Sequence, residues 1–256
     1  MATLRKELEK RELETLDLFT ISFSLFKSNF INFLIISLIC CMPLILTGIY
    51  FPIKIFDPSQ IKNAEELIKW FKYDADIGFY INIFLSWFLD IISVLSVSLL
   101  VERLIYGSKK TASWAIVKSF NFLPSALFTS LIYSILVFLG FTFFIVPGIA
   151  LIILFVFSKN ICVLRHTWGI NALKYSFYLS KPKFFKTLFI LGFIFLFQNV
   201  FSITFFPSSL NNREDLLSYF ISMIVLYIFD TYFKIITALF FLNRDYFSNM
   251  QYDEKE

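Results

Sequence analysis

The sequence predicts an all-α polytopic membrane protein, a bundle of six transmembrane helices, and three observations support this fold class. The composition is 58% hydrophobic and only 16% charged, whereas soluble domains are roughly half apolar and about a quarter charged. Six apolar stretches are each long enough to cross a bilayer. Lys and Arg are divided unequally between alternate loops, as expected of a chain that crosses the membrane repeatedly.

The apolar stretches define the expected spans, because a spanning helix needs about 20 mainly apolar residues. They occupy residues 29–51, 77–101, 122–146, 147–164, 187–206 and 217–241. The run from 119 to 158 contains no charged residue and is too long for one span. Pro147 and Gly148 divide it, which predicts a hairpin of two helices with almost no loop.

The distribution of bases predicts the orientation. With the N-terminus inside, the cytoplasmic segments contain 17 Lys and Arg residues and the outer segments contain five. This bias predicts that both termini are cytoplasmic. The expected organisation is a cytoplasmic segment 1–28, a transmembrane domain 29–242 and a polar cytoplasmic tail 243–256.

Three short amphipathic helices are expected at the membrane surface, near residues 13–28, 63–73 and 171–181. The first has apolar residues every three or four positions, a pattern typical of a surface helix: Leu13, Leu16, Phe19, Phe23 and Phe26. The first 28 residues carry five acids beside five bases, and no apolar core precedes a small-residue cleavage site, so we do not expect a cleaved signal peptide. An ordinary solvated leader remains an alternative.

The segment from 165 to 186 contains five bases and no acid. These bases are Arg165, Lys174, Lys181, Lys183 and Lys186. Bases at a membrane surface attract anionic headgroups by on the order of 1 kcal/mol each. Recognition of a specific anionic lipid is one interpretation, and the general excess of bases on the cytoplasmic side explains the same residues.

Ionisable side chains within spans are costly and mark either function or a paired structural contact. Asp90 and Asp230 each follow the start of their span by 13 residues, so both lie roughly 20 Å below the outer boundary. Lys234 lies one turn beyond Asp230 on the same helix face. Gln198 and Asn199 fall near the middle of the fifth span.

Polar neighbours extend these residues into a predicted seam between the second, fifth and sixth spans. One stripe contains Asn82, Ser86, Asp90 and Ser93, and the other contains Tyr227, Asp230, Lys234 and Thr237. An ion pair that locks the helices together is one interpretation, and a site that handles protons or a substrate is the other. We expect no broken helix of the kind that many transporters use, which favours the first interpretation.

Two segments carry a resemblance to a known family. The sequence FIVPGIAL at 144–151 is followed by GINALKYSFYLSK at 169–181. This pairing resembles the bacterial YciC-like family, related to the membrane domain attached to some glycerophosphodiester phosphodiesterases. The residues that match are Pro147, Gly148, Ala172, Leu173 and Ser176. The chain departs from the family at Arg165 and His166, where members often carry an acid, and at Pro182, where they often have Gly.

The resemblance implies architecture more than activity, because the family has no assigned reaction. The motif residues still have a physical interpretation. Pro147 suits a first helical turn, and Gly148 permits a close approach of two backbones. Asn171 is a candidate N-cap, and Pro182 ends the helix that follows. Ala172 and Ser176 offer a small face for another helix.

For function we expect a non-enzymatic accessory protein or scaffold in envelope or lipid homeostasis. The alternative is a small transporter or lipid-handling protein that uses Asp90, Asp230 and Lys234, and a distant alternative is an intramembrane hydrolase. Expected partners are the bilayer with its anionic headgroups and a membrane protein or a second copy of the chain. No nucleic-acid surface, cofactor or metal site is expected, since the three cysteines lack metal-like spacing and His166 is the single histidine.

Overall fold

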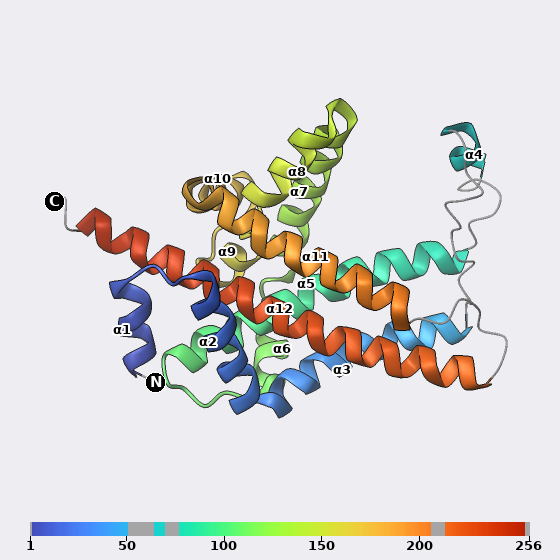
Figure 1. Ribbon diagram of the computed structural model, residues 1–256, viewed down its shortest axis with the longest axis horizontal. Coiled ribbons are helices and arrows are strands. Elements are labelled where there is room, and N and C mark those ends of the chain that lie inside the picture. The colour runs from blue at the N-terminus through green and yellow to red at the C-terminus, as the bar shows by residue number, and fades with distance from the viewer. Residues whose placement is uncertain (1, 51–63, 70–76, 206–212, 254–256) are drawn as a thin grey trace.

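The computed structural model describes residues 2–50, 64–69, 77–205 and 213–253. All regular elements in these ranges are helices (Figure 1). They are α1 (Ala2–Lys10), α2 (Thr15–Ser28), α3 (Phe30–Tyr50), α4 (Ala64–Lys69), α5 (Ile77–Ile105), α6 (Ala112–Phe120), α7 (Leu123–Phe143), α8 (Ile145–Leu154), α9 (Ser158–Leu164), α10 (Gly169–Ser180), the 3₁₀ turn η3 (Lys181–Lys183), α11 (Phe184–Phe205) and α12 (Arg213–Asp253). Six stretches are long and apolar enough to cross a membrane. The chain is therefore an all-α, multi-pass membrane protein, and the predicted fold class is confirmed.

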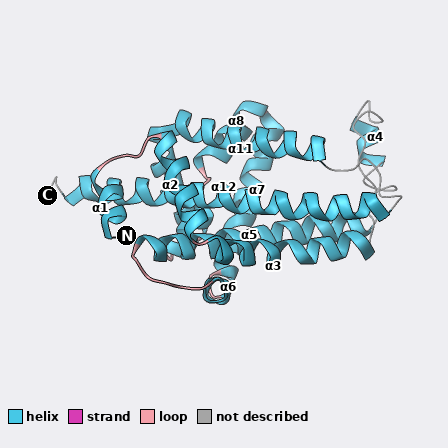
Figure 2. Cartoon of the chain, turned by 60° about the horizontal axis from the view of Figure 1, so that its bottom comes forward, coloured by secondary structure: helices cyan, strands magenta, loops and turns pink. Residues whose placement is uncertain are grey.

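The long helices α3, α5 and α12 pack side by side and form the centre of the bundle (Figure 2). Their core lies in the half nearer the chain termini, where α5 is mostly buried from Leu89 onward and α12 from Thr231 to Asp245. The short helices α1, α2, α6 and α9 cover this half through contacts with α5 or α12. The start of α1 and the end of α12 lie at the same end of the molecule (Figure 1).

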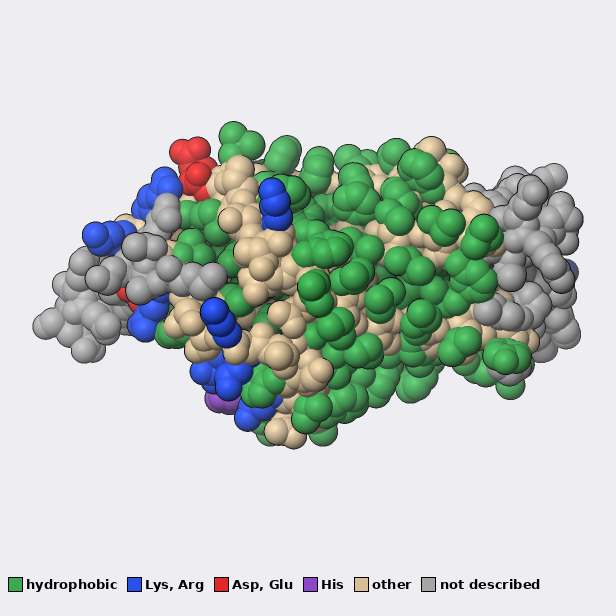
Figure 3. All heavy atoms as spheres, turned by 90° about the horizontal axis from the view of Figure 1, so that it is seen from below, with side chains coloured by type: hydrophobic (Ala, Val, Ile, Leu, Met, Phe, Trp, Pro, Cys, Tyr) green, Lys and Arg blue, Asp and Glu red, His purple; other side chains and the backbone are tan. Residues whose placement is uncertain are grey.

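The surface has two kinds of region. On the face drawn in Figure 3, Lys and Arg gather toward the end that carries the termini, and apolar side chains cover most of the remaining length. Large apolar side chains such as Phe138 on α7 and Ile203 on α11 are 71% and 84% exposed. Apolar surface of this extent is stable in contact with lipid chains rather than water.

The predicted hairpin is present, but its break lies three residues before Pro147. Helix α7 ends at Phe143 and α8 begins at Ile145, with Phe144 in extended conformation between them. Pro147 instead occupies the first turn of α8, where a missing N–H leaves no intrahelical bond unmade. A Cβ on Gly148 would lie 2.6 Å from the ring of Phe141, so the expected close approach of the two helices is confirmed.

The fourth span is discontinuous, and the expectation of an unbroken helix there is wrong. Helix α8 ends at Leu154 and α9 starts at Ser158. The Ser176 hydroxyl of α10 fills the break: it donates to the Leu154 carbonyl at 2.9 Å and accepts from the Phe157 N–H at 3.1 Å. A side chain from another helix thus satisfies backbone groups that the interrupted helix leaves free.

The helix predicted within 13–28 is present as α2, and its apolar residues have two different environments. Leu18 and Leu25 are buried, whereas Leu16 and Phe23 are 76% and 57% exposed. The helix packs against α12, and the hydroxyl of Tyr232 donates to the Phe19 carbonyl at 3.1 Å. One side of α2 therefore packs on the bundle, and Leu16 and Phe23 on the other side stay exposed. The expected contact of this side with the bilayer surface stays a prediction.

The predicted polar tail begins at residue 243, and the structure shows that it is helical as far as Asp253, as part of α12. The side chain of Asn243 accepts from the Leu13 N–H at 3.0 Å and donates to the carbonyls of Leu8 and Arg11 at 3.0 and 2.9 Å. Arg244 pairs with Glu12. The end of α12 therefore binds the segment between α1 and α2, and its polar residues have protein partners.

The other two surface helices are partly as predicted. Helix α4 covers Ala64–Lys69, and the remainder of the 63–73 prediction lies outside the described residues. Helix α10 confirms a helix at 171–181, but it begins at Gly169, which has a φ of 63°. Trp168 occupies the N-cap position, so Asn171 is not the cap. Ala172 and Ser176 are fully buried, as expected of a small packing face.

Candidate functional site

Four ionisable side chains from three spans meet inside the bundle. Asp90 of α5 lies between two lysines: its Oδ2 is 2.5 Å from the Nζ of Lys159 on α9, and its Oδ1 is 2.9 Å from the Nζ of Lys234 on α12. The Nζ of Lys234 also lies 2.5 Å from Oδ2 of Asp230, one turn earlier on α12. Two carboxylates and two ammonium groups therefore form one neutral network.

The polar seam extends from this network to the fifth span. Gln198 of α11 donates from Nε2 to Oδ1 of Asp230 at 3.2 Å. Each of the four carboxylate oxygens of Asp90 and Asp230 thus accepts a bond from a charged or amide donor. The structure brings Gln198, Asp90, Asp230 and Lys234 together, as the sequence predicted.

A cavity of about 350 Å³ lies beside the network, between α5, α11 and α12. We call it the central cavity, and it is lined by Ser86, Asp90, Gln198, Asn199, Ser202, Leu226, Tyr227, Asp230 and Lys234. The Asp90 side chain is 39% exposed and that of Asp230 is 25% exposed, whereas Lys234 is 10% exposed. The carboxylates consequently retain open surface although both belong to membrane spans.

Not every residue of the predicted stripes reaches the central cavity. Asn82 accepts a bond from Thr47 of α3 at 2.9 Å and donates to the Gly78 carbonyl at 2.9 Å. Asn199 lines the cavity, but its amide donates to the Phe195 carbonyl of its own helix at 2.7 Å. In the α5 stripe, Asn82 therefore serves packing against α3, whereas Ser86 and Asp90 line the cavity and the buried Ser93 does not.

Lys159 belongs to the network although it is not among the residues of the predicted seam. It is the second residue of α9, directly after the break that Ser176 fills. The break redirects the chain and so places this lysine against Asp90 of α5. The predicted seam contains two acids, Asp90 and Asp230, but only one lysine, Lys234. This imbalance of charge is the signal that could have indicated a second cation.

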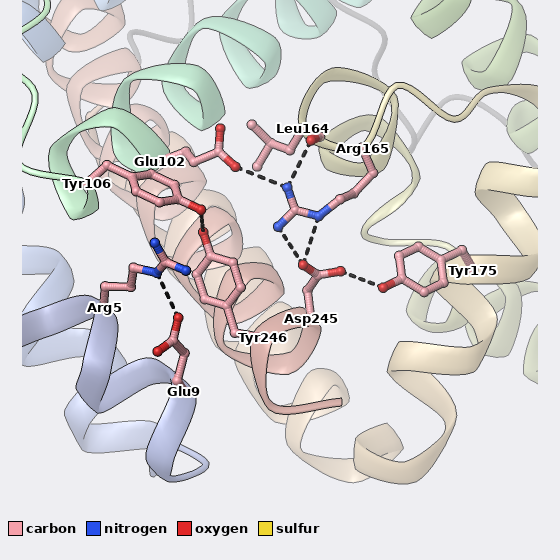
Figure 4. A network of polar contacts seen from close by, with 9 residues as sticks. All are labelled: Arg5, Glu9, Glu102, Tyr106, Leu164, Arg165, Tyr175, Asp245 and Tyr246. Carbon is pink, nitrogen blue, oxygen red and sulfur yellow. Dashed lines mark hydrogen bonds and ion pairs between the residues drawn. The ribbon is translucent and has the colours of Figure 1, made fainter. Parts of the chain in front are cut away.

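A second network joins four helices at the end of the bundle that carries the termini (Figure 4). Arg165, after α9, donates to Oδ2 of Asp245 at 2.5 and 2.8 Å and to Glu102 at 3.1 Å. The hydroxyl of Tyr175 donates to the other oxygen of Asp245 at 2.5 Å. Burial opposes the charge of Arg165, but its bonds to Asp245 and Glu102 outweigh burial and raise the pKa of its guanidinium above the ordinary value.

The five predicted lipid-binding bases have different environments. Arg165 is engaged in the network of Figure 4, Lys183 pairs with Glu12, and Lys186 donates to the Leu13 carbonyl. These three bind protein groups, and their contact with lipid headgroups stays a prediction. Lys174 is exposed, and Lys181 lies 5.5 Å from the ring of Phe177; in the described part of the chain no carboxylate pairs with either.

The residues that match the family motif contribute to helix packing in the structure. Gly148 lies at the α7–α8 contact, Ala172 and Leu173 are buried, and Ser176 bridges the broken fourth span. None of them lines the central cavity. The described residues contain no group of three or more His, Cys, Asp or Glu that could hold a metal ion.

Comparison of the chain with protein-family models, with curated proteins and with solved structures gives no match. The resemblance to the YciC-like family therefore stays a prediction, and the function is argued from the chain's own residues.

Proposed function

We propose that this chain is a non-enzymatic membrane protein that binds a small polar solute or a lipid headgroup in the central cavity, as a transporter or lipid-handling protein. One observation carries the proposal: Asp90 and Asp230 keep exposed carboxylate surface beside a polar cavity within the spans. A charged group facing lipid is costly, so a cavity that exposes it is expected to hold water or a polar ligand.

The charges of the cavity suggest the chemistry of the ligand. A ligand ammonium group suits Asp90 or Asp230, and a ligand carboxylate or phosphate suits Lys234. Because the network is neutral overall, a zwitterionic or uncharged polar ligand enters without leaving an unbalanced charge in the bilayer.

The second candidate is the accessory or scaffold function expected from the sequence. It is favoured by the completeness of the network, in which every carboxylate oxygen of Asp90 and Asp230 already has a donor. A complete network locks helices together without any ligand. In that case a helix of a partner membrane protein covers the exposed side of the cavity.

The remaining expectations belong to the same proposal. The gathering of Lys and Arg at the end with the termini supports N-in and C-in orientation in a bacterial cytoplasmic membrane (Figure 3). An intramembrane hydrolase is the least supported alternative. Lys234 lies between the carboxylates of Asp90 and Asp230 and pairs with both, so the two acids do not share a proton directly.

Native mass spectrometry of the protein, released gently from its own membrane, tests the proposal. The informative variants are Asp90→Asn and the double change Asp230→Leu with Lys234→Met, which removes an ion pair without leaving a lone charge. Asp17→Asn is the matched control, because Asp17 lies on α2 outside the cavity. Thermal unfolding in the same detergent checks that each variant is folded.

Ligand binding predicts a bound small molecule or lipid in the parent protein and in Asp17→Asn that is lost from both cavity variants. A scaffold predicts a stoichiometric partner protein that the double variant retains. Retention of the same small molecule by all variants would contradict the assignment of the central cavity as its site.

A further inference from the structure

A second site lies away from the central cavity, between α7 and α10. Two cavities of about 660 and 540 Å³ adjoin there and share Ile132, Ile170 and Lys174. Together we call them the interfacial groove. Its first part is lined by Phe128, Ile132, His166, Thr167, Trp168, Gly169, Ile170, Asn171 and Lys174, and its second by Ile132, Leu136, Phe155, Ile170, Leu173, Lys174 and Phe177.

The two ends of the groove differ in polarity. The first end contains the side chains of His166, Thr167 and Asn171, which follow the fourth span or begin α10. Apart from Lys174 at the junction, the second end is lined only by apolar side chains, including Leu136 of α7 and Phe155 at the break of the fourth span. A polar end followed by an apolar channel matches an amphiphile and not a soluble ion.

The apolar end of the groove extends away from the polar loop along one face of α7. Phe128, Ile132 and Leu136 follow one another at intervals of four residues on α7. They rise roughly 12 Å along the helix axis. Helix α7 begins at Leu123, near the polar loop after the fourth span, so this stripe leads into the membrane. The acyl chain of a lipid whose headgroup lies at the membrane surface also runs from the surface into the membrane.

The charge of the groove selects the headgroup. Lys174 lines both parts, and no acidic side chain lines either. Within the described ranges no carboxylate pairs with Lys174, whereas nearby Arg165 and Lys183 pair with acids of this chain. A free ammonium group at the junction of a polar and an apolar cavity suits a lipid phosphate.

We infer that the interfacial groove binds an anionic phospholipid, with its phosphate at Lys174 and an acyl chain between Leu136, Phe155 and Phe177. The inference is independent of the proposed function, because the central cavity and the groove share no residue. Of the five bases predicted to contact lipid, the inference selects Lys174 for the phosphate. Lys174 is exposed, and the cavities that it lines contain no acidic side chain.

Native mass spectrometry of the purified protein with added phosphatidylglycerol or phosphatidylcholine of identical acyl chains tests the headgroup contact. Lys174→Gln is compared with Lys181→Gln, a change of another exposed lysine that lines neither cavity. We expect the parent to prefer phosphatidylglycerol and Lys174→Gln to bind it roughly fivefold more weakly, as one headgroup contact implies. Lys181→Gln is expected to bind as the parent does.

The acyl contact is tested by Leu136→Trp, which fills the apolar end, with Leu139→Trp as control, because Leu139 is exposed on α7 and does not line the groove. We expect Leu136→Trp to lose the bound lipid and Leu139→Trp to retain it, with unfolding temperatures close to that of the parent. Equal losses from Lys174→Gln and Lys181→Gln, or from the two tryptophan variants, would overturn the inference. Asp90→Asn is expected to leave phosphatidylglycerol binding unchanged. The inference about the groove and the proposal about the central cavity can therefore be rejected separately.

Discussion

The Nζ of Lys159 lies 2.5 Å from Oδ2 of Asp90, although 69 residues separate the two along the chain. The contact joins the second half of the broken fourth span to the centre of the bundle. It also makes the Asp90 carboxylate one member of a four-charge network with Asp230 and Lys234.

Lys159→Met is expected to destabilise the protein, because Asp90 then keeps only Lys234, which it shares with Asp230. Breaking a buried ion pair costs about 3–5 kcal/mol. Since the Asp90 side chain is 39% exposed, we expect a smaller cost of about 1–3 kcal/mol. Thermal unfolding in detergent measures it, with Lys181→Met as the control. An unfolding temperature equal to that of the control would show that Lys159 does not compensate Asp90.

Ser176→Ala is expected to lower stability by about 1–3 kcal/mol, because it leaves the Phe157 N–H and the Leu154 carbonyl buried without a partner. Ser180→Ala on the same helix is the matched control. The Ser180 hydroxyl is buried and has no hydrogen-bond partner, so its removal is expected to be neutral or slightly stabilising. Hydrogen exchange at Phe157 gives a local readout, and unchanged protection there would contradict the bridging role.

Gly148→Ala is expected to destabilise the α7–α8 hairpin by about 1–3 kcal/mol, since the new methyl group would overlap the ring of Phe141. Gly192→Ala on α11 is the control: nothing lies within 4 Å of the Cβ position there. In that helix the change is expected to stabilise by up to about 1 kcal/mol. Urea unfolding followed by circular dichroism compares the two variants, and effects of the same sign and size would argue against the close helix contact.

Arg165→Met is expected to cost about 3–5 kcal/mol, because it leaves the fully buried Asp245 without its cation. The folded protein raises the pKa of Arg165 above its ordinary value. The stabilisation is therefore fully present below that ordinary value and is lost only as the pH rises beyond it, into strong alkali. The difference in unfolding temperature between parent and variant, measured from pH 6 to 9, is expected to stay constant. A difference that vanished within this range would contradict the prediction.

The spans and three members of the central network could be predicted from the sequence, because both follow from the cost of placing polar groups in lipid. Apolar length defines the helices, and Asp90, Asp230 and Lys234 are conspicuous against it. The break of the fourth span could not be predicted in the same way. Residues 155–157 contain neither Gly nor Pro, and the backbone groups there are satisfied by Ser176, a residue of another helix.

The end of α12 shows a second limit of the sequence. Asn243, Arg244 and Asp245 follow the last apolar stretch and have the composition of a solvated tail. Their partners lie far away in the chain, at Glu12, Leu13 and Arg165. Hydropathy measures the preference of a residue for water or lipid, but it does not indicate which polar group has a partner within the protein.

The bonds of Asn243 also constrain the order in which the molecule is completed. Its side chain binds backbone groups of Leu8, Arg11 and Leu13. Leu8 leaves the ribosome before Asn243, because the two are 235 residues apart in the chain. The segment from Leu8 to Leu13 therefore waits through the insertion of the candidate spans that lie between it and Asn243, so it reaches its final position after residues that are made later.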